Sequence, residues 1–296
     1  MKRILLLTVI SLSYFSVFGQ DRYPNLIIGS NEIRTLPPRT YSFDTIHVKT
    51  NGKLKFSDNS NKWAILNANV FILEGSIEYI NFSRNAGTVT SILESGKSIE
   101  YKFPEKSFGG VGGNGSGNGI QMGGYGFVSN SGDGGGGGSG AQQSSLTNSS
   151  SAGINAVSYK GAPSGLGSAG SFGGDGGRST NNNGGLLYIK TKIFQVGTAG
   201  SINLSGSNGV NGKSGGGGSC YRTYRNAGGG GGGGSAGGDG GVLIADFLEI
   251  NNYPRVNVNP GRGGKGGSGG KASNCSYDGT DGAEGDIGTE GYVDWN

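Results

Sequence analysis

The sequence is poor in the residues that build ordinary cores, metal sites and triple helices. Only 32% of its 296 residues are hydrophobic, and it has one His, two Cys and seven Pro. One His and two Cys exclude a His cluster or a Cys-rich metal site. Glycine is abundant instead: only six of the 66 glycines precede residue 105, so an ordinary large core is excluded for the C-terminal two thirds. That stretch has three prolines, Pro163, Pro254 and Pro260, too few for the roughly 15–20% of a collagen helix.

The N-terminus has the pattern of a secretory signal. Lys2 and Arg3 precede an apolar run over residues 4–18, which is shorter than the about 20 residues of a membrane span. Small residues at the cleavage positions predict a signal peptide over 1–19 and a mature chain that begins near Gln20. The alternative is an N-terminal membrane anchor. No second apolar stretch of spanning length follows, so we expect a secreted, extracellular or cell-surface protein without a membrane span.

The charge balance argues against a nucleic-acid partner. Without Lys2 and Arg3, the chain has 22 basic and 20 acidic residues, and this near-neutral chain lacks the basic footprint of a general nucleic-acid binder.

Outside the cytoplasm, Cys220 and Cys275 are able to form a disulfide. The alternative is two free, buried thiols.

Residues 20–104 are predicted to form an N-terminal β-solenoid-like region. The segment YSFDTIHV alternates over 41–48, Asn51-Gly52 is a turn signal, and Leu54-Lys55-Phe56 resumes the extended pattern. Residues 63–82 then predict two short strands that meet at a corner.

This two-strand unit recurs in the region 105–296, at 186–204 and at 242–258. The anchors Val70-Phe71-Ile72, Ile193-Phe194-Gln195 and Phe247-Leu248-Glu249 align, and Ser76-Ile77-Glu78, Ser201-Ile202-Asn203 and Arg255-Val256-Asn257 align after the corner. Repeated short strands predict a solenoid whose turns stack on one core. A β-sandwich with coincidental similarity is the alternative. The fold class is thus mostly β, with almost no α-helix after the signal peptide.

Glycine-rich stretches separate these units, and several keep a period of three. Runs begin at Gly206, Gly231, Gly261 and Gly279, and another spans 167–176. Three residues per turn is the geometry of a polyproline-II-like helix, and glycine at every third place lets helices approach backbone to backbone. We therefore expect a bundle of polyglycine-II helices. Flexible Gly/Ser linkers are the alternative, although they have no reason to keep the register.

This alternation of β-units with long glycine runs resembles two groups of proteins. One is the glycine-rich secreted proteins of bacterial surfaces, and the other is the tip adhesins of phage long tail fibres. The resemblance implies polyglycine-II bundles whose connecting loops touch a receptor. The leader, which is similar to those of Bacteroidota, favours a bacterial surface or extracellular protein over a phage one.

The sequence shows no recognisable catalytic motif. His47 is the only His and lies at an alternating strand position, and no nucleophile elbow or P-loop is present. Six acidic residues lie between Asp278 and Asp294, and among them Asp281, Glu284 and Asp286 are weak candidates for Ca²⁺. A solvated acidic edge is the alternative for these acids. We expect no other cofactor and no enzymatic activity.

Two interruptions of the glycine runs carry the candidate binding residues. If Cys220 bonds Cys275, the two loops meet, and their Tyr and Arg side chains would stack on sugar rings and bind carboxylate or phosphate. The alternative is that these tyrosines cap the bundle. The sequence thus predicts a non-enzymatic adhesion or structural protein for a glycan or surface protein. A β-helix carbohydrate-active enzyme, a subunit of an outer-membrane complex and an ice-binding protein are alternatives. The candidate binding residues are Tyr221, Arg222, Tyr224, Arg225, Tyr277 and Asp278.

Overall fold

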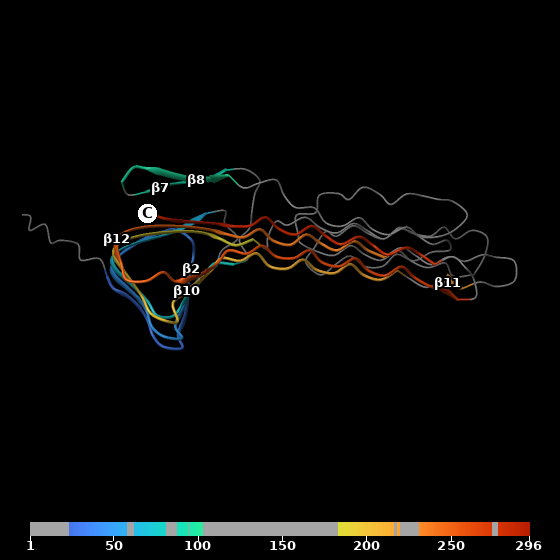
Figure 1. The fold of residues 1–296 in the computed structure, drawn as a ribbon, viewed down its shortest axis with the longest axis horizontal. Helices are drawn as coiled ribbons and strands as arrows, with labels where there is room; N and C mark the ends of the chain where they lie inside the picture. The colour runs from blue at the N-terminus through green and yellow to red at the C-terminus, as the bar shows by residue number, and fades with distance from the viewer. Residues whose placement is uncertain are drawn as a thin grey trace, which may run out of the picture.

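A body of parallel strands and an arm of glycine-rich segments make up the part of the chain that the computed structural model describes. Figure 1 shows the strands gathered at one end and the glycine-rich segments running side by side away from them. The described residues contain no helix, which confirms the prediction of a mostly β protein for this part. They are residues 24–57, 62–80, 88–93, 95–102, 183–215, 218–219, 231–273 and 278–296.

The strands of the body form two sheets in which every neighbouring pair is parallel. The chain alternates between the sheets, adding one strand to each in turn. The six-stranded sheet has the order β1 (Leu26–Ile28), β3 (Thr40–Val48), β5 (Trp63–Leu73), β9 (Leu186–Val196), β12 (Val242–Ile250), β15 (Tyr292–Trp295). The five-stranded sheet has the order β13 (Arg255–Asn257), β10 (Ser201–Asn203), β6 (Ser76–Glu78), β4 (Lys53–Phe56), β2 (Ile33–Leu36).

One apolar cluster joins the two sheets. Residues in register on successive strands bury the same kind of side chain, as with Phe71 and Phe194, whose rings lie 5.2 Å apart. Ile77 and Ile202 pair in the same way in the other sheet and are at most 1% exposed. Strands from the N-terminal region and from the two later units therefore share one core.

The predicted alignment of the strands after the corner is confirmed. The alignment of the anchor triplets before the corner is confirmed for the first two copies and is wrong by two residues in the copy at 242–258. Ser76, Ser201 and Arg255 pair as expected, and so do Val70 and Ile193. However, Glu249 rather than Phe247 pairs with Ile193. The last corner is two residues shorter than the one before it, because Ile250 pairs with Phe194 while Arg255 pairs with Ser201.

An antiparallel hairpin packs on the outside of the six-stranded sheet. It consists of β7 (Thr88–Ile92) and β8 (Ser98–Lys102), and the solenoid prediction for residues 20–104 did not include it. The Trp63 indole donates to the Val89 carbonyl at 3.1 Å, and Val89 and Ile99 are buried. The hairpin explains why four successive residues of β5, from Trp63 to Leu66, are all at most 2% exposed.

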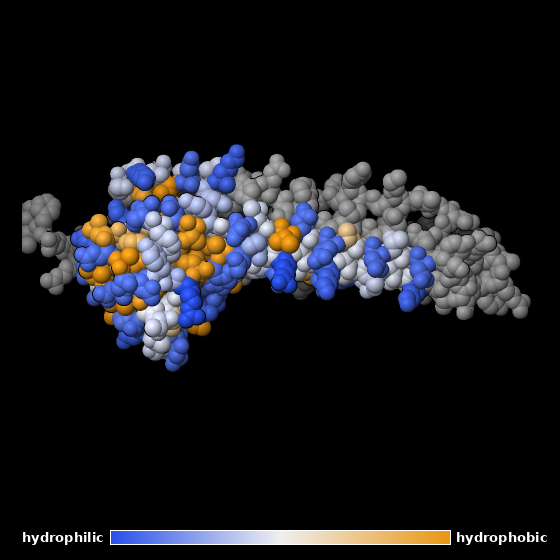
Figure 2. All heavy atoms as spheres, in the orientation of Figure 1, coloured by the Kyte–Doolittle hydropathy of each residue, from blue (hydrophilic) through white to orange (hydrophobic). Residues whose placement is uncertain are grey.

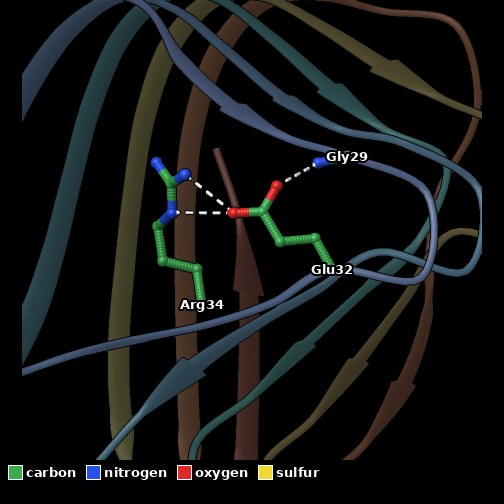
Figure 3. Close-up of polar contacts among 3 residues, drawn as sticks. All are labelled: Gly29, Glu32 and Arg34. Carbon is green, nitrogen blue, oxygen red and sulfur yellow. Dashed lines mark hydrogen bonds and ion pairs between the residues drawn. The ribbon is translucent and has the colours of Figure 1, made fainter.

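Among the described residues, β1 and β2 are edge strands, and Glu32 supplies a missing hydrogen-bond acceptor at the corner between them. In the next turn, Lys49 N donates to Ile28 O, but Gly29 N, the equivalent amide, donates to Glu32 Oε2 at 2.7 Å. Glu32 Oε1 also accepts from Arg34 Nη2 at 2.7 Å (Figure 3). The amide hydrogen bond from Gly29 and those from Arg34 lower the pKa of Glu32 from its usual 4.5.

In the described residues, four glycine-rich segments form the arm, and each continues a strand of the body. The first (204–215) follows β10 and the third (258–270) follows β13, whereas the second (231–241) leads into β12 and the fourth (278–291) into β15. Two short strands, β11 (Gly218–Ser219) and β14 (Ala272–Ser273), pair in parallel beyond the first and third segments.

Backbone hydrogen bonds join the arm segments at every third residue. The amides of Gly206, Gly209, Gly212 and Gly215 donate to carbonyls 259, 262, 265 and 268 of the third segment at 2.7–2.9 Å. The second segment donates to the first and to the fourth, the third to the second, and the fourth to the third. The second and third segments therefore each bond to the three others, and the whole second segment is buried.

The third segment displays the period of three most clearly. Its residues from Gly261 to Gly270 follow the order buried, exposed, intermediate three times. The buried glycines face other backbones: a Cβ on Gly264 would lie 2.1 Å from Val210 O, and one on Gly234 would lie 1.8 Å from Gly264 O. Such distances leave no room for any side chain, so glycine is required at these positions.

The cap at Glu32 predicts an acid-sensitive contribution to stability. Because the pKa of Glu32 is lower in the folded chain than its usual 4.5, its contribution is complete above about pH 4.5 and is lost as the pH falls through the folded value. We expect the melting temperature to fall over that window, and to fall less steeply in Glu32→Gln than in the parent chain. Melting curves between pH 6 and pH 2 followed by circular dichroism, with Glu284→Gln as the control, check this. Identical slopes for Glu32→Gln and the parent would contradict it.

The contacts of Gly234 predict that one methyl group destabilises the arm. We expect Gly234→Ala to lower the free energy of unfolding by at least the about 1–3 kcal/mol typical of overpacking, because the backbone of the third segment has to move away. The control is Glu284→Ala, at an exposed position of the fourth segment, which we expect to change stability by less than about 0.5 kcal/mol. Denaturant unfolding of the two variants measures the difference, and equal stability would refute the packing argument.

Candidate functional site

The described segments that flank the two predicted binding loops end together at the far end of the arm. Gly215 N donates to Ser268 O, Gly279 N donates to Gly270 O, and the register of β11 and β14 sets Ser219 beside Ser273. The stretches 220–230 and 274–277 connect these ends. Both connections therefore start and finish at the same end of the arm, opposite the body.

Most of the predicted binding residues lie outside the described residues. These are Tyr221, Arg222, Tyr224, Arg225 and Tyr277, together with the expected disulfide partners Cys220 and Cys275. Asp278 is described: it is exposed and begins the fourth segment. The signal peptide predicted over 1–19 also lies outside the described residues.

The acidic residues of the fourth segment lie along an exposed edge of the arm. Asp281, Glu284 and Asp286 are all exposed, and Asp281 Oδ1 accepts the Gly269 amide at 2.7 Å. Within the described ranges, no three acidic, His or Cys side chains are grouped as cation ligands. The edge thus offers separate carboxylates, one of which already binds the arm's own backbone.

An asparagine ladder joins the first segment to the exposed edge of the third. Asn208 Oδ1 accepts the Arg262 amide at 2.9 Å, and Asn211 Oδ1 accepts the Lys265 amide at 2.8 Å, 54 residues apart in each case. These amides belong to the exposed third of the segment, and no backbone carbonyl of the described residues accepts either of them. The Arg262 and Lys265 side chains are left exposed, and Figure 2 shows hydrophilic side chains repeated at intervals along the arm.

A buried carboxylate anchors the arm where it meets the body. Asp239 is 1% exposed; its Oδ1 accepts the Thr289 amide at 2.7 Å, and its backbone N–H donates to Asn183 Oδ1. Gly184 N donates in turn to the Asp239 carbonyl at 2.8 Å. This network ties the second and fourth segments to the start of β9, so its role is structural.

Sequence reasoning missed a groove on the body. It has a volume of about 520 Å³ and crosses β3, β5, β9 and β12. Polar residues at the middle of long apolar strands line it, and Asn67-Ala68-Asn69 and Lys190-Thr191-Lys192 occupy the same register on neighbouring strands. The signal in the sequence was this interruption of the apolar runs WAIL–VFIL and LLYI–IFQV by short polar stretches.

His47, the only histidine, has a local partner. Its Nε2 lies 3.1 Å from Glu74 Oε2, and the two residues flank the corner between the sheets. No nucleophilic side chain is seen in hydrogen-bond contact with His47 among the described residues. The contact with Glu74 fits the structural or surface role expected for His47, which stays a prediction.

The chain has no significant match among protein-family models, curated proteins or solved structures. In the described ranges, no helix has the length and apolar character needed to cross a membrane. The functional argument therefore depends on the geometry of the arm and the body.

Proposed function

We propose that this chain is a secreted, non-enzymatic adhesion protein of the cell surface, in which the body holds an arm that presents contact loops at its far end. The observation that carries the proposal is the lateral bonding of the arm segments at every third residue. It supports a stiff spacer built from a composition that is flexible in isolated chains. The loops would then be held at a fixed distance from the body.

The body is, in this proposal, a short right-handed β-solenoid. Its support is the regular alternation of the chain between two parallel sheets, in which each corner stacks on the one before. Ser76 N donates to Gly52 O, Ser201 N to Gly75 O and Arg255 N to Gly200 O along one such column. A β-sandwich whose units resemble one another only by coincidence would not repeat these hydrogen bonds from one corner to the next.

The arm segments are, in this proposal, polyglycine-II helices. The support is their period of three in both hydrogen bonding and burial. At about 3.1 Å per residue, the 13 residues 258–270 would extend about 40 Å. Ordering glycine is costly, because each residue's backbone loses about 1–2 kcal/mol of entropy while a hydrogen bond returns about 0.5–1.5 kcal/mol. A bundle offsets this cost better than a single helix, since the central segments bond on several sides.

A disulfide between Cys220 and Cys275 would complete the far end. The pairing of β11 with β14 supports it, because Ser219 and Ser273 lie side by side just before the two cysteines in the sequence. A bridge there would add about 2–4 kcal/mol by restraining the unfolded chain. Peptide mapping without reductant tests the bridge, and two alkylatable thiols in the folded protein would exclude it.

The contact chemistry proposed for the loops is that of a glycan or a surface protein. Tyr221 and Tyr224 offer rings for stacking on a sugar or an apolar patch, and Arg222 and Arg225 offer paired donors for carboxylates. Tyr277 and Asp278 would lie at the same end, from the second connection. A free-standing adhesin and a subunit of a larger outer-membrane assembly both fit this arrangement.

Loop substitutions test the proposal. We expect Tyr224→Ala and Arg225→Ala each to weaken binding to the best ligand on a glycan array, or to whole bacterial or host cells, by at least tenfold, because buried aromatic and Arg anchors dominate interfaces. Lys265→Ala, an exposed basic residue midway along the arm, is the matched control and should bind as the parent does. Circular dichroism confirms folding of all three. Parent-level binding by both loop variants would reject the loops as the contact surface.

A further inference from the structure

The groove on the six-stranded sheet follows a line where the parallel ladder is interrupted. The pairing passes from Ala68–Thr191 directly to Val70–Ile193, and the neighbouring strand pairs skip the same step. On β9, Thr191 is buried between the exposed Lys190 and Lys192, and Phe194 is buried although it lies three residues further on, so the alternation of faces shifts between them. The groove is therefore built into three successive strand pairs rather than into a loop.

Small side chains at the interruption leave the space open. Phe43, Ala68, Thr191 and Phe247 are in register, so two rings flank two small residues. The single hydroxyl proton of Thr191 is shared between the Ile193 carbonyl at 3.0 Å and the Asn69 carbonyl of the neighbouring strand at 3.3 Å, which ties the strands together at this point. The volume of about 520 Å³ is in the range of small-molecule sites, about 300–1,000 Å³. Three strand spacings, about 14 Å, give room for a short linear ligand laid across the strands.

The charged groups of the groove fall into two kinds. Asp246 is held by the chain itself, since its Oδ2 accepts the Tyr188 hydroxyl and its Oδ1 accepts Asn296 Nδ2 at 3.1 Å. Burial and this carboxylate raise the pKa of Tyr188 above its usual 10.0, so the hydroxyl stays a donor over the physiological range. Lys190 and Lys192 are exposed, and the ion pairs found in the described part of the chain involve neither.

The neutral polar groups of the groove have hydrogen-bonding capacity to spare. Asn67 Nδ2 donates to Ser42 Oγ and Asn69 Nδ2 donates to Asp44 Oδ1. Within the described part of the chain, each carboxamide therefore keeps its carbonyl oxygen and a second N–H for a ligand hydroxyl. A site with apolar surface, uncommitted amides and two free ammonium groups matches a ligand with apolar C–H faces, hydroxyls and carboxylates.

We propose that this groove binds a short oligosaccharide of uronic acids, with Lys190 and Lys192 pairing with its carboxylates and Asn67 and Asn69 with its hydroxyls. Charge-assisted hydrogen bonds from the two lysines select the acidic sugar over its neutral counterpart. The site lies on the body, so it is separate from the loops of the arm and would give the protein a second point of attachment.

The test uses the full mature chain, with tetragalacturonate as the probe and its methyl ester as the matched neutral ligand. Titration calorimetry should show binding of the acid that weakens as salt rises, and at least tenfold weaker binding of the ester. The double variant Lys190→Gln/Lys192→Gln should lose at least tenfold in affinity, while Lys49→Gln, an exposed lysine outside the groove, should not.

Several results would each overturn the proposal. They are no binding of tetragalacturonate by the parent chain, equal binding of acid and ester, and parent-level affinity in the double variant with its melting curve unchanged. Binding of a sulfated tetrasaccharide but not of the uronate would also overturn it. Because the loop variants Tyr224→Ala and Arg225→Ala leave the groove intact, they should bind tetragalacturonate as the parent does. A failure of the groove proposal can therefore be distinguished from a failure of the proposed adhesive function of the loops.

Discussion

The structure of the arm depends on the absence of a Cβ atom at every third position. A backbone amide bonds a neighbouring segment only if the two chains lie flush, and at Gly234 or Gly264 an added carbon would overlap a carbonyl. Only the positions that face solvent escape this constraint, and they carry Arg262, Lys265 and the fourth segment's acids, whereas the second segment is buried throughout. One constraint thus produces both the buried interior of the arm and its charged exterior.

The body supplies the apolar surface that the glycine-rich part of the chain lacks. A chain that is about one third glycine after residue 104 loses much entropy on ordering and offers little apolar surface in return. The two parallel sheets supply that apolar surface. The chain runs from β10 and β13 into the first and third arm segments, and it returns through the second and fourth segments into β12 and β15. Asp239 and Asn183 join the two parts where the second segment enters β12. The arm is therefore an extension of the sheets' own turns.

Much of this architecture was predictable from local patterns. The alternation over 41–48 and the aligned triplets Ser76-Ile77-Glu78 and Ser201-Ile202-Asn203 identify strands and their register, because stacked parallel turns repeat the same burial. The two-residue shift of the copy that ends at Ile250 was not predictable from the aligned triplets. The corner after Ile250 is two residues shorter than the corner before it, and a side chain replaces a backbone contact there: Asn251 Oδ1 accepts the Val196 amide. The groove at Lys190 was missed because it arises from packing between strands that are distant in the sequence. The hairpin over 88–102 is local, and it was missed because its two short alternating segments were not recognised as strands. The residues predicted to bind at the arm's far end remain predictions.

Residue-resolved amide hydrogen exchange of the folded chain tests the central claim most directly. The account predicts protection with a period of three along the fourth segment, with slow exchange at Gly282, Gly285 and Gly288, whose amides bond the third segment, and fast exchange at Ala283 and Glu284. Uniform exchange at the random-coil rate across residues 278–291 would contradict the account, because it would mean that the glycine-rich segments do not bond one another in solution.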